Sequence, residues 1–477
     1  MLRISVLAQN VGIAEDALRL LIGMILAYPV FILYTISGLR RCSTLIQHLY
    51  FISTGMLISY WTLGIECLAH NLICIIGNYI ILKVLNRSFY SAVCAFIFQL
   101  GYLSVGLYFE NATTDYKVTW TMPHCILCLR LIGTAIDVYD GTKHVDFLDQ
   151  DQKLNALKDV PSILEMTSHI FYLPSYFIGP QHSMRRFRKF IQRNIDDGDM
   201  TGSTMFAFKR FLLAMLYFLI HFFLSGISPE SYITSADFAQ LSYLEMSLYL
   251  SIWVKGHVAR LIGVWLLTEG SVVLSGLGYN GKSEDGDIAW NGGANVRVWL
   301  YETCTNYHQM IQSVNINTNA WVKTYVFKRC KFLKNQMLSQ LITVLFLAIW
   351  HGSHSGYYLT FLYQILIVRC EKQFFCMVDN SPRMNKLYQS SVFVKVSKAL
   401  GYCYFLFFLP HCVIPFVLLS YNVYAPLVLT TRCVILIVFG SWPLWKFLVK
   451  MMLNPRKNEH AATDKSKPKG GKKSHVS

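Results

Sequence analysis

Residues 338–368 read LSQLITVLFLAIWHGSHSGYYLTFLYQILIV, an apolar stretch with two histidines near its centre. A helix needs about 20 apolar residues to cross the hydrocarbon core of a bilayer, so this stretch is long enough. A titratable ring at that depth is costly and is by default a sign of function. The alternative is a packing helix whose histidines bond only to neighbouring carbonyls. The stretch therefore predicts a membrane helix that carries a functional site.

The centre of this stretch contains groups suited to proton transfer. Imidazole has the side-chain pKa nearest neutrality, so His351 is a candidate general base. In a continuous helix, His351, Ser355 and Tyr358 would share one face, with His354 beside them. We therefore expect one helical face to present the reactive groups.

Two glycines of the same segment are spaced for close packing. Gly352 and Gly356 are four residues apart and would lie on one side of a continuous helix. Such a small-x-x-x-small pair allows a neighbouring backbone to approach closely.

The rest of the chain repeats this apolar character. Its 477 residues are 54% hydrophobic and only 15% charged, against roughly 25% charged in soluble proteins. No alternation of period two suggests a barrel. The sequence predicts an all-α multi-pass membrane protein with ten or eleven transmembrane helices. The expected spans are residues 17–37, 45–63, 67–82, 88–109, 118–136, 208–224, 241–267, 338–368, 392–421 and 425–449, with shorter apolar segments at 163–178 (re-entrant or interfacial) and 271–277.

The net charge of +16 does not indicate a nucleic-acid partner. The basic residues lie between apolar runs and in the C-terminal tail, which is typical of membrane-facing loops. The thirteen cysteines show no framework spacing, and Cys125 and Cys128 fall in an expected span, so we expect no metal site. The tail, residues 456–477, has seven basic and two acidic residues. It is predicted to be disordered and cytosolic.

Three asparagines in five residues mark the polar segment that precedes the histidine span. Asn315, Asn317 and Asn319 are of a type that breaks or caps helices, because the side-chain amide competes with the backbone. One interpretation is an N-cap before a helix over residues 321–335. The other is an amide positioned against the histidines, where it can hold a carbonyl or hydroxyl group.

A basic repeat follows the asparagines. Lys328, Lys331 and Lys334 recur every three residues, which is typical of an interfacial helix with a cationic stripe. These lysines are expected either to reach lipid phosphates or to bind a phosphorylated soluble donor such as coenzyme A. A buried base, an amide and a cationic entrance together favour group transfer from a water-borne donor to a lipid-borne acceptor.

The motif W-H-G-x-x-x-G-Y, present at residues 350–357, resembles that of the membrane-bound O-acyltransferase family. Asn315 falls on the family's second position, an Asn or Asp some tens of residues earlier. The runs 315–322 and 274–281 look like those of the family's lysophospholipid acyltransferases. Two departures are Ser355, where many phospholipid members have proline, and Trp290-Asn291, where the family has Trp-Asp.

This resemblance implies a helical chamber that opens to the cytosol and sideways to the bilayer. His351 would be the general base toward a free sn-2 hydroxyl, and Asn315 would orient the acyl carbonyl or that hydroxyl. His354 is the alternative base, and Tyr357 or Tyr358 would line the tunnel. Acyl-CoA is then a substrate, and no cofactor or metal is required.

The function implied is re-esterification of lysophosphatidylcholine, with lysophosphatidylethanolamine and lysophosphatidylserine as further acceptors and a preference for unsaturated acyl-CoA. Membrane lipids and a second copy of the chain, in a homo-oligomer, are the other partners that we consider. The expected location is the endoplasmic reticulum membrane, which Lys472-Lys473 supports as a dilysine-like signal. The expected divisions are N-terminal helices (1–136), a catalytic core (137–455) and the tail (456–477). Acylation of a protein or sterol, and a transporter or channel without acyl transfer, are the alternatives.

Overall fold

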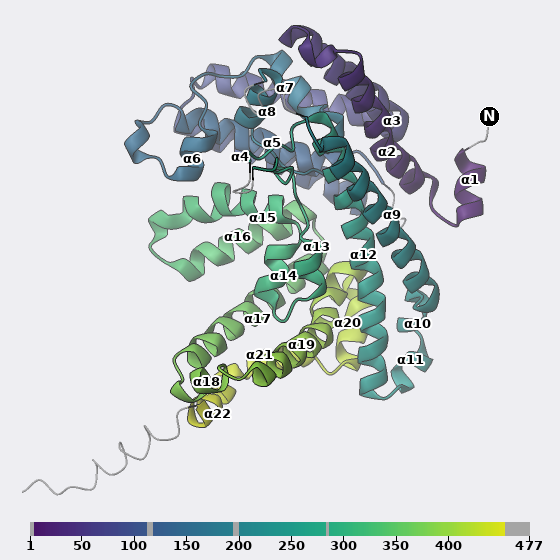
Figure 1. The fold of residues 1–477 in the computed structure, drawn as a ribbon, viewed down its shortest axis with the longest axis vertical. Coiled ribbons are helices and arrows are strands. Elements are labelled where there is room, and N and C mark those ends of the chain that lie inside the picture. Colours follow the sequence, from purple (N-terminus) through teal and green to yellow (C-terminus); the bar gives the residue numbers. More distant parts are fainter. Residues whose placement is uncertain (1–3, 112–117, 194–199, 283–285, 454–477) are drawn as a thin grey trace, which may run out of the picture.

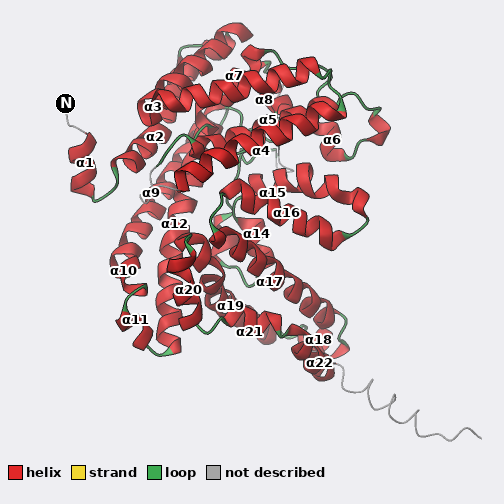
Figure 2. Ribbon diagram, turned by 180° about the vertical axis from the view of Figure 1, so that it is seen from behind, coloured by secondary structure: helices red, strands yellow, loops and turns green. Residues whose placement is uncertain are grey.

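The computed structural model describes residues 4–111, 118–193, 200–282 and 286–453. Within these ranges all regular elements are helices, apart from isolated β-bridges (Figure 2). The all-α fold predicted from the sequence is confirmed. The basic tail, predicted to be disordered, lies outside the described residues.

The first half of the chain supplies nine α-helices and three short 3₁₀ turns. The α-helices are α1 (Ile4–Val11), α2 (Glu15–Ile36), α3 (Thr44–Val84), α4 (Phe89–Asn111), α5 (Thr121–Asp140), α6 (Gln150–Asn155), α7 (Ile163–Ile170), α8 (Met184–Ile191) and α9 (Ser203–Ile227). The 3₁₀ turns are Leu39–Arg41, Val145–Phe147 and Leu173–Ser175.

The second half continues with α10 (Glu230–Ile233), α11 (Ala236–Gln240), α12 (Tyr243–Ser275), α13 (Val298–Glu302), α14 (Tyr307–Ser313) and α15 (Ile316–Val322). A π-helical turn (Lys323–Phe327) and a 3₁₀ turn (Lys328–Leu333) follow. The remaining helices are α16 (Gln336–His351), α17 (Ser355–Asp379), α18 (Pro382–Leu387), α19 (Ser391–Leu418), α20 (Tyr421–Thr430), α21 (Val434–Gly440) and α22 (Trp442–Leu453).

Fewer helices are suited to cross a membrane than the sequence predicted. Seven helices of the described residues are long and apolar enough, or eight if the bent pair α20 and α21 forms one span. The prediction of ten or eleven differs from this count at two places. The expected spans 45–63 and 67–82 are two helical parts that join across a kink at Gly64, and they count here as one helix, α3. The expected span 338–368 is broken into α16 and α17.

The break between α16 and α17 corrects the prediction of one continuous helical face. Gly352 has φ 135° and ψ −174°, a conformation that favours glycine and ends the helix after His351. The chain remains extended at His354, and α17 begins at Ser355. His351 therefore ends one helix and His354 precedes the next.

The helix α12 is longer than its expected span because it has strong signals at both ends. Ser242 and Glu245 form a capping box at its start, and Gly276, with φ 100°, follows its last residue. The expected segment 271–277 is the C-terminal end of α12 and the turn after it. Helix α9 runs alongside α12 for much of its length (Figure 1).

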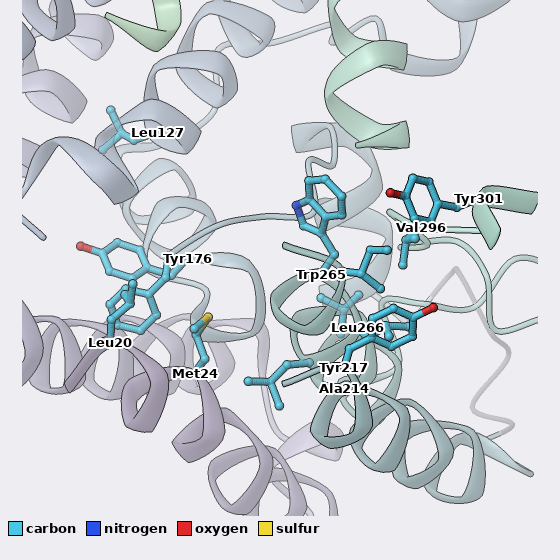
Figure 3. Close-up of a cluster of buried hydrophobic side chains, with 14 of the residues drawn as sticks. Leu20, Met24, Leu127, Tyr176, Ala214, Tyr217, Trp265, Leu266, Val296 and Tyr301 are labelled. Atoms are coloured by element: carbon cyan, nitrogen blue, oxygen red, sulfur yellow. The ribbon is translucent and has the colours of Figure 1, made fainter. Parts of the chain in front are cut away.

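The core joins the first helices to the centre of the molecule. One buried cluster contains Leu20 and Met24 of α2, Leu127 of α5, and Trp265 and Leu266 of α12 (Figure 3). In the view of Figure 1, α2 to α8 form the upper part and α17 to α22 the lower part. Helices α15 and α16 lie between these two parts. Asn315 immediately precedes α15, and His351 is the last residue of α16.

Candidate active site

A cavity of about 1230 Å³ brings four of the predicted site residues together. Asn315, His351, His354 and Tyr357 all line it. The other lining side chains come mainly from α4, α5, α12 and the end of α19, and most of them are apolar or aromatic. Asn315 and His351, which are separate in the sequence, therefore both lie at the wall of an apolar chamber.

Aromatic rings surround His351. The centroid of its imidazole lies 5.3 Å from that of Tyr357, 5.5 Å from that of Phe361 and 5.1 Å from that of Phe416. The ring of the preceding residue, Trp350, is 4.7 Å away, and its Nε1–H donates to the Cys125 carbonyl of α5 at 3.0 Å. Packing therefore holds the imidazole.

The start of α17 is pressed against α19. A Cβ placed on Gly356 would lie 1.9 Å from the carbonyl oxygen of Pro415, and the Gly356 N–H donates to the Leu419 carbonyl at 3.2 Å. The predicted close approach thus occurs at Gly356. Gly352 has a different role, because it makes the turn between the two helices.

The three asparagines have different environments. Asn315 has φ 50° and stands at the N-cap position of α15, yet its side chain makes no capping hydrogen bond. The Asn317 Nδ2 donates to the Ala294 carbonyl at 2.7 Å. The Asn319 Nδ2 donates to the Ile311 and Val314 carbonyls at 3.0 and 3.1 Å. Among the three, Asn315 is the one that lines the cavity, whereas the other two side chains support the loop.

The prediction of a helix over residues 321–335 is wrong. Helix α15 already ends at Val322, and the chain continues as a π-helical and then a 3₁₀ turn. This irregular segment is hydrogen-bonded to α5. The Tyr325 hydroxyl donates to the Asp137 carboxylate at 2.9 Å, and the Arg329 guanidinium donates to Asp140 at 2.9 Å. Helix α5 therefore anchors the segment that follows Asn315.

The three lysines lie outside the cavity and do not form a helical stripe. Lys328 is ion-paired with Asp149, at 3.4 Å, and with Asp151, whose hydrogen bond raises the pKa of the lysine. Lys331 and Lys334 are exposed. Lys334 has φ 50° and ends the 3₁₀ turn, so the regular surface helix that was predicted is not formed. Tyr358 is also exposed, and it is not among the residues that line the cavity.

A second pocket, of about 150 Å³, lies on another side of α15. It is lined by Asn317 and Thr324 and by three side chains that each have a buried polar atom without a partner in the described structure: Arg130, Gln181 and His182. The Arg130 guanidinium also donates to the carbonyls of His169 and Ser175, at 2.9 and 2.8 Å. Sequence reasoning missed this pocket, although an arginine inside an apolar span is itself a signal of function.

The large cavity also has a polar, aromatic region at the start of α5. The rings of Trp120 and His70 stack at a centroid distance of 3.8 Å, and the His70 Nδ1 is 2.7 Å from the Tyr102 hydroxyl. Glu110 lines the same region and accepts hydrogen bonds from Thr119 and Thr121. These residues come from α3, α4 and α5, and their sequence spacing does not indicate that they meet.

A buried glutamate connects the elements that carry the site. The Glu371 carboxylate of α17 accepts hydrogen bonds from the Tyr307 N–H at the start of α14, at 2.9 and 3.1 Å, and from the Tyr404 hydroxyl of α19, at 3.0 Å. Helix α14 leads directly into the Asn315 loop, and α17 carries Tyr357. This carboxylate therefore ties the two sides of the cavity together.

Comparison with known proteins places the chain in a family. The model of the membrane-bound O-acyltransferase family matches residues 105–414. Lysophospholipid acyltransferase 5 of Mus musculus is 39% identical over 388 residues, which cover 81% of this chain and 79% of the relative. The Homo sapiens protein of that name has the same identity and coverage, and the Drosophila melanogaster protein is 36% identical, covering 77% of this chain and 73% of the relative.

The chain belongs to the membrane-bound O-acyltransferase family, and it is a multi-pass membrane acyltransferase. The resemblance inferred from the histidine motif and the asparagine run is thereby confirmed.

Proposed function

We propose that this acyltransferase moves the acyl group of acyl-CoA to the free sn-2 hydroxyl of a lysophospholipid, with lysophosphatidylcholine as the main acceptor. One observation carries the proposal: Asn315 and His351 line the same apolar cavity. The similarity to proteins named lysophospholipid acyltransferase 5 supports a lysophospholipid as the acceptor. Lysophosphatidylethanolamine and lysophosphatidylserine are further acceptors in this proposal, and unsaturated acyl-CoA is the preferred donor.

In the proposed reaction, His351 is the general base. Its imidazole accepts the proton of the sn-2 hydroxyl while that oxygen attacks the thioester carbonyl carbon. The Asn315 amide N–H donates a hydrogen bond to the carbonyl oxygen as negative charge develops on it. The carbon–sulfur bond then breaks, and the thiolate of coenzyme A takes the proton from His351. The products are a diacyl phospholipid and free coenzyme A.

The surroundings of the two residues suit this reaction. A cavity of about 1230 Å³ exceeds the roughly 300–1000 Å³ of pockets for drug-sized ligands, so it has room for two chains. Its apolar wall excludes water, which would otherwise hydrolyse the thioester. The His351 ring lines this cavity, where a substrate hydroxyl can approach it.

The polar pocket beside α15 suits the donor. The pantetheine arm of coenzyme A contains amide groups, which both donate and accept hydrogen bonds. Arg130 offers an unpartnered donor there and Gln181 an unpartnered acceptor. Buried polar groups of this kind are costly unless a ligand or water satisfies them. In this proposal the arm lies in the pocket, and the exposed Lys331 and Lys334 attract the phosphates of the donor.

The aromatic region of the large cavity suits the acceptor headgroup. A quaternary ammonium group is attracted to the face of an aromatic ring, and Trp gives the strongest attraction. Trp120 and Tyr102 line this region, and Glu110 adds a carboxylate. The trimethylammonium group of lysophosphatidylcholine would bind here, while its acyl chain lies along the apolar wall. We place the enzyme in the endoplasmic reticulum membrane.

A direct assay tests the proposal. The purified protein is incubated with a panel of lysophospholipids and acyl-CoA species, and the products are identified by mass spectrometry. We expect diacyl phosphatidylcholine as the major product, formed one-for-one with free coenzyme A. Acyl transfer to a peptide or sterol acceptor in place of lysophospholipids would overturn the proposal, as would solute flux without consumption of acyl-CoA.

A further inference from the structure

The backbone conformation of Asn315 is unusual for a residue at the N-cap of a helix. The residue has φ 50° and ψ 40°, in the left-handed region, immediately before α15. An asparagine at an N-cap normally accepts a hydrogen bond from the second or third N–H of its helix. The Asn315 side chain makes no such bond. Some other group must satisfy the first N–H groups of α15, because unpaired buried N–H groups are rare.

Asn295 is that group. Its backbone carbonyl accepts a hydrogen bond from the Ile316 N–H at 3.1 Å. Its side-chain Oδ1 accepts one from the Asn317 N–H at 2.9 Å. These are the first and second N–H groups of α15, so a residue 20 positions earlier in the chain supplies the cap that Asn315 would otherwise provide. Only 3% of the Asn295 surface is exposed.

The residues that follow Asn295 pair with those that precede Asn315, and this pairing fixes the position of Asn295 relative to α15. Val296 forms an antiparallel bridge with Val314, and the Arg297 N–H donates to the Ser313 carbonyl at 2.7 Å. The strand-like pairing thus ends one residue before Asn315. The Asn295 side chain extends past Asn315, the residue with positive φ, and bonds to α15.

We propose that Asn295 is a positioning residue that caps α15 in place of Asn315 and so leaves the Asn315 amide directed toward the acyl cavity. The inference rests on the proposed role of Asn315 in the reaction. Without the Asn295 Oδ1, the Asn317 N–H loses its acceptor. The Asn315 side chain stands at the N-cap position and is of the type that caps such an N–H. The amide would then bond to its own helix instead of the substrate, and turnover would fall with little change in substrate binding.

A double-mutant cycle tests this inference. Turnover and KM for both substrates are measured for Asn295→Ala, Asn315→Ala and the double variant, in the purified full-length protein. We expect Asn295→Ala to lower kcat roughly tenfold or more, since losing an oxyanion donor costs about 10²–10³. In the Asn315→Ala background the same change should add almost no further loss. Losses that multiply would overturn the inference, because they would mean that Asn295 acts independently of Asn315.

Two further variants separate positioning from stability. Asn295→Asp keeps an acceptor oxygen for the Asn317 N–H, so it should retain most of the turnover that Asn295→Ala loses. An aspartate variant as slow as the alanine variant would overturn the inference. Asn319→Ala is the matched control, since it removes two hydrogen bonds from the same loop. It should lower the unfolding temperature without the kcat loss of Asn295→Ala. If Asn295→Ala is too unstable to purify, Asn295→Ser repeats the cycle.

Other measurements test the proposed function independently of Asn295. Wild-type kcat in Asn315→Ala alone would remove the role given to that amide, and the positioning role with it. The identity of the acceptor and of the donor is established by the product assay, which does not depend on Asn295.

Discussion

The two residues proposed to carry the reaction are held in the same cavity by different kinds of contact. His351 ends a regular helix and is surrounded by the rings of Trp350, Tyr357 and Phe416. Asn315 stands before a short helix whose first two N–H groups are hydrogen-bonded to Asn295. Apolar packing is non-directional, whereas hydrogen bonds require each donor and acceptor to keep its place.

This difference predicts different responses to substitution. Around the histidine, a change should matter through the volume that it adds or removes. Around the asparagine, the loss of one polar partner should matter even when volume hardly changes. The predictions below test this contrast, from the largest expected effect to the smallest.

Replacing His351 should have the largest effect. We expect His351→Ala to lower kcat per folded enzyme by about 10²–10⁴, the usual contribution of a general base. The loss of ring volume should in addition lower the unfolding temperature, without preventing expression. Single-turnover acyl transfer measures the loss of activity. His354→Ala is the matched control, since His354 lines the same cavity. Near-normal turnover in His351→Ala, with loss in His354→Ala, would transfer the role of base to His354.

The three asparagines should separate into one catalytic and two structural residues. Asn315→Ala should reduce transition-state stabilisation by about 2.7–4 kcal/mol, as loss of other oxyanion donors does. Asn317→Ala and Asn319→Ala should mainly lower the unfolding temperature, because their side chains bond to backbone carbonyls. The measurements are kcat per folded enzyme and thermal unfolding in detergent. Equal kcat losses in all three variants would contradict the separation.

Adding volume at the histidine side should destabilise the fold. Gly356→Val places atoms against the Pro415 carbonyl, which belongs to the backbone of α19 and cannot rotate away. Overpacking of this kind costs about 1–3 kcal/mol, so the unfolding temperature should fall. Gly226→Ala is the control, because a Cβ there meets no atom within 4 Å. Similar stability of both variants would argue against tight packing of α17 on α19.

The three lysines should respond differently to charge reversal. Charge reversal at the exposed Lys331 and Lys334 should raise KM for acyl-CoA and leave KM for lysolipid nearly unchanged. Added salt should mimic this change, since exposed charges are screened over about 8–10 Å. Lys328→Glu should instead lower stability, because it breaks the ion pairs with Asp149 and Asp151. Unchanged KM values in the Lys331 and Lys334 variant would mean that those lysines do not meet the donor.

The smallest effect is expected at the aromatic region. Trp120→Leu should raise KM for lysophosphatidylcholine more than KM for lysophosphatidylserine, because only the first carries a quaternary ammonium group. A cation–π contact is worth about 0.5–2 kcal/mol, so the change in preference should be modest. Competition assays with both acceptors measure it. An equal rise for both acceptors would show that the ring shapes the cavity without recognising the headgroup.

Much of the candidate site could be predicted from short sequence patterns. Residues 350–357 and the run that begins at Asn315 are contiguous, so their residue types alone indicate the motif. The apolar runs likewise predict helices, because a helix in a bilayer must satisfy its backbone groups internally. The limits of the membrane spans were predicted less accurately, since a single glycine at position 64 or 352 changes the path of a helix.

The sequence by itself determined that this protein is helical, that it lies in a membrane, and which histidine and asparagine to test. Only the tertiary structure decided that the Asn315 side chain does not cap its own helix, because the cap comes from Asn295. It also decided that Lys328 is neutralised by Asp151, 177 residues away. Local patterns record the propensities of neighbouring residues, whereas these contacts join residues far apart in the chain, and only the packing of helices brings such residues together.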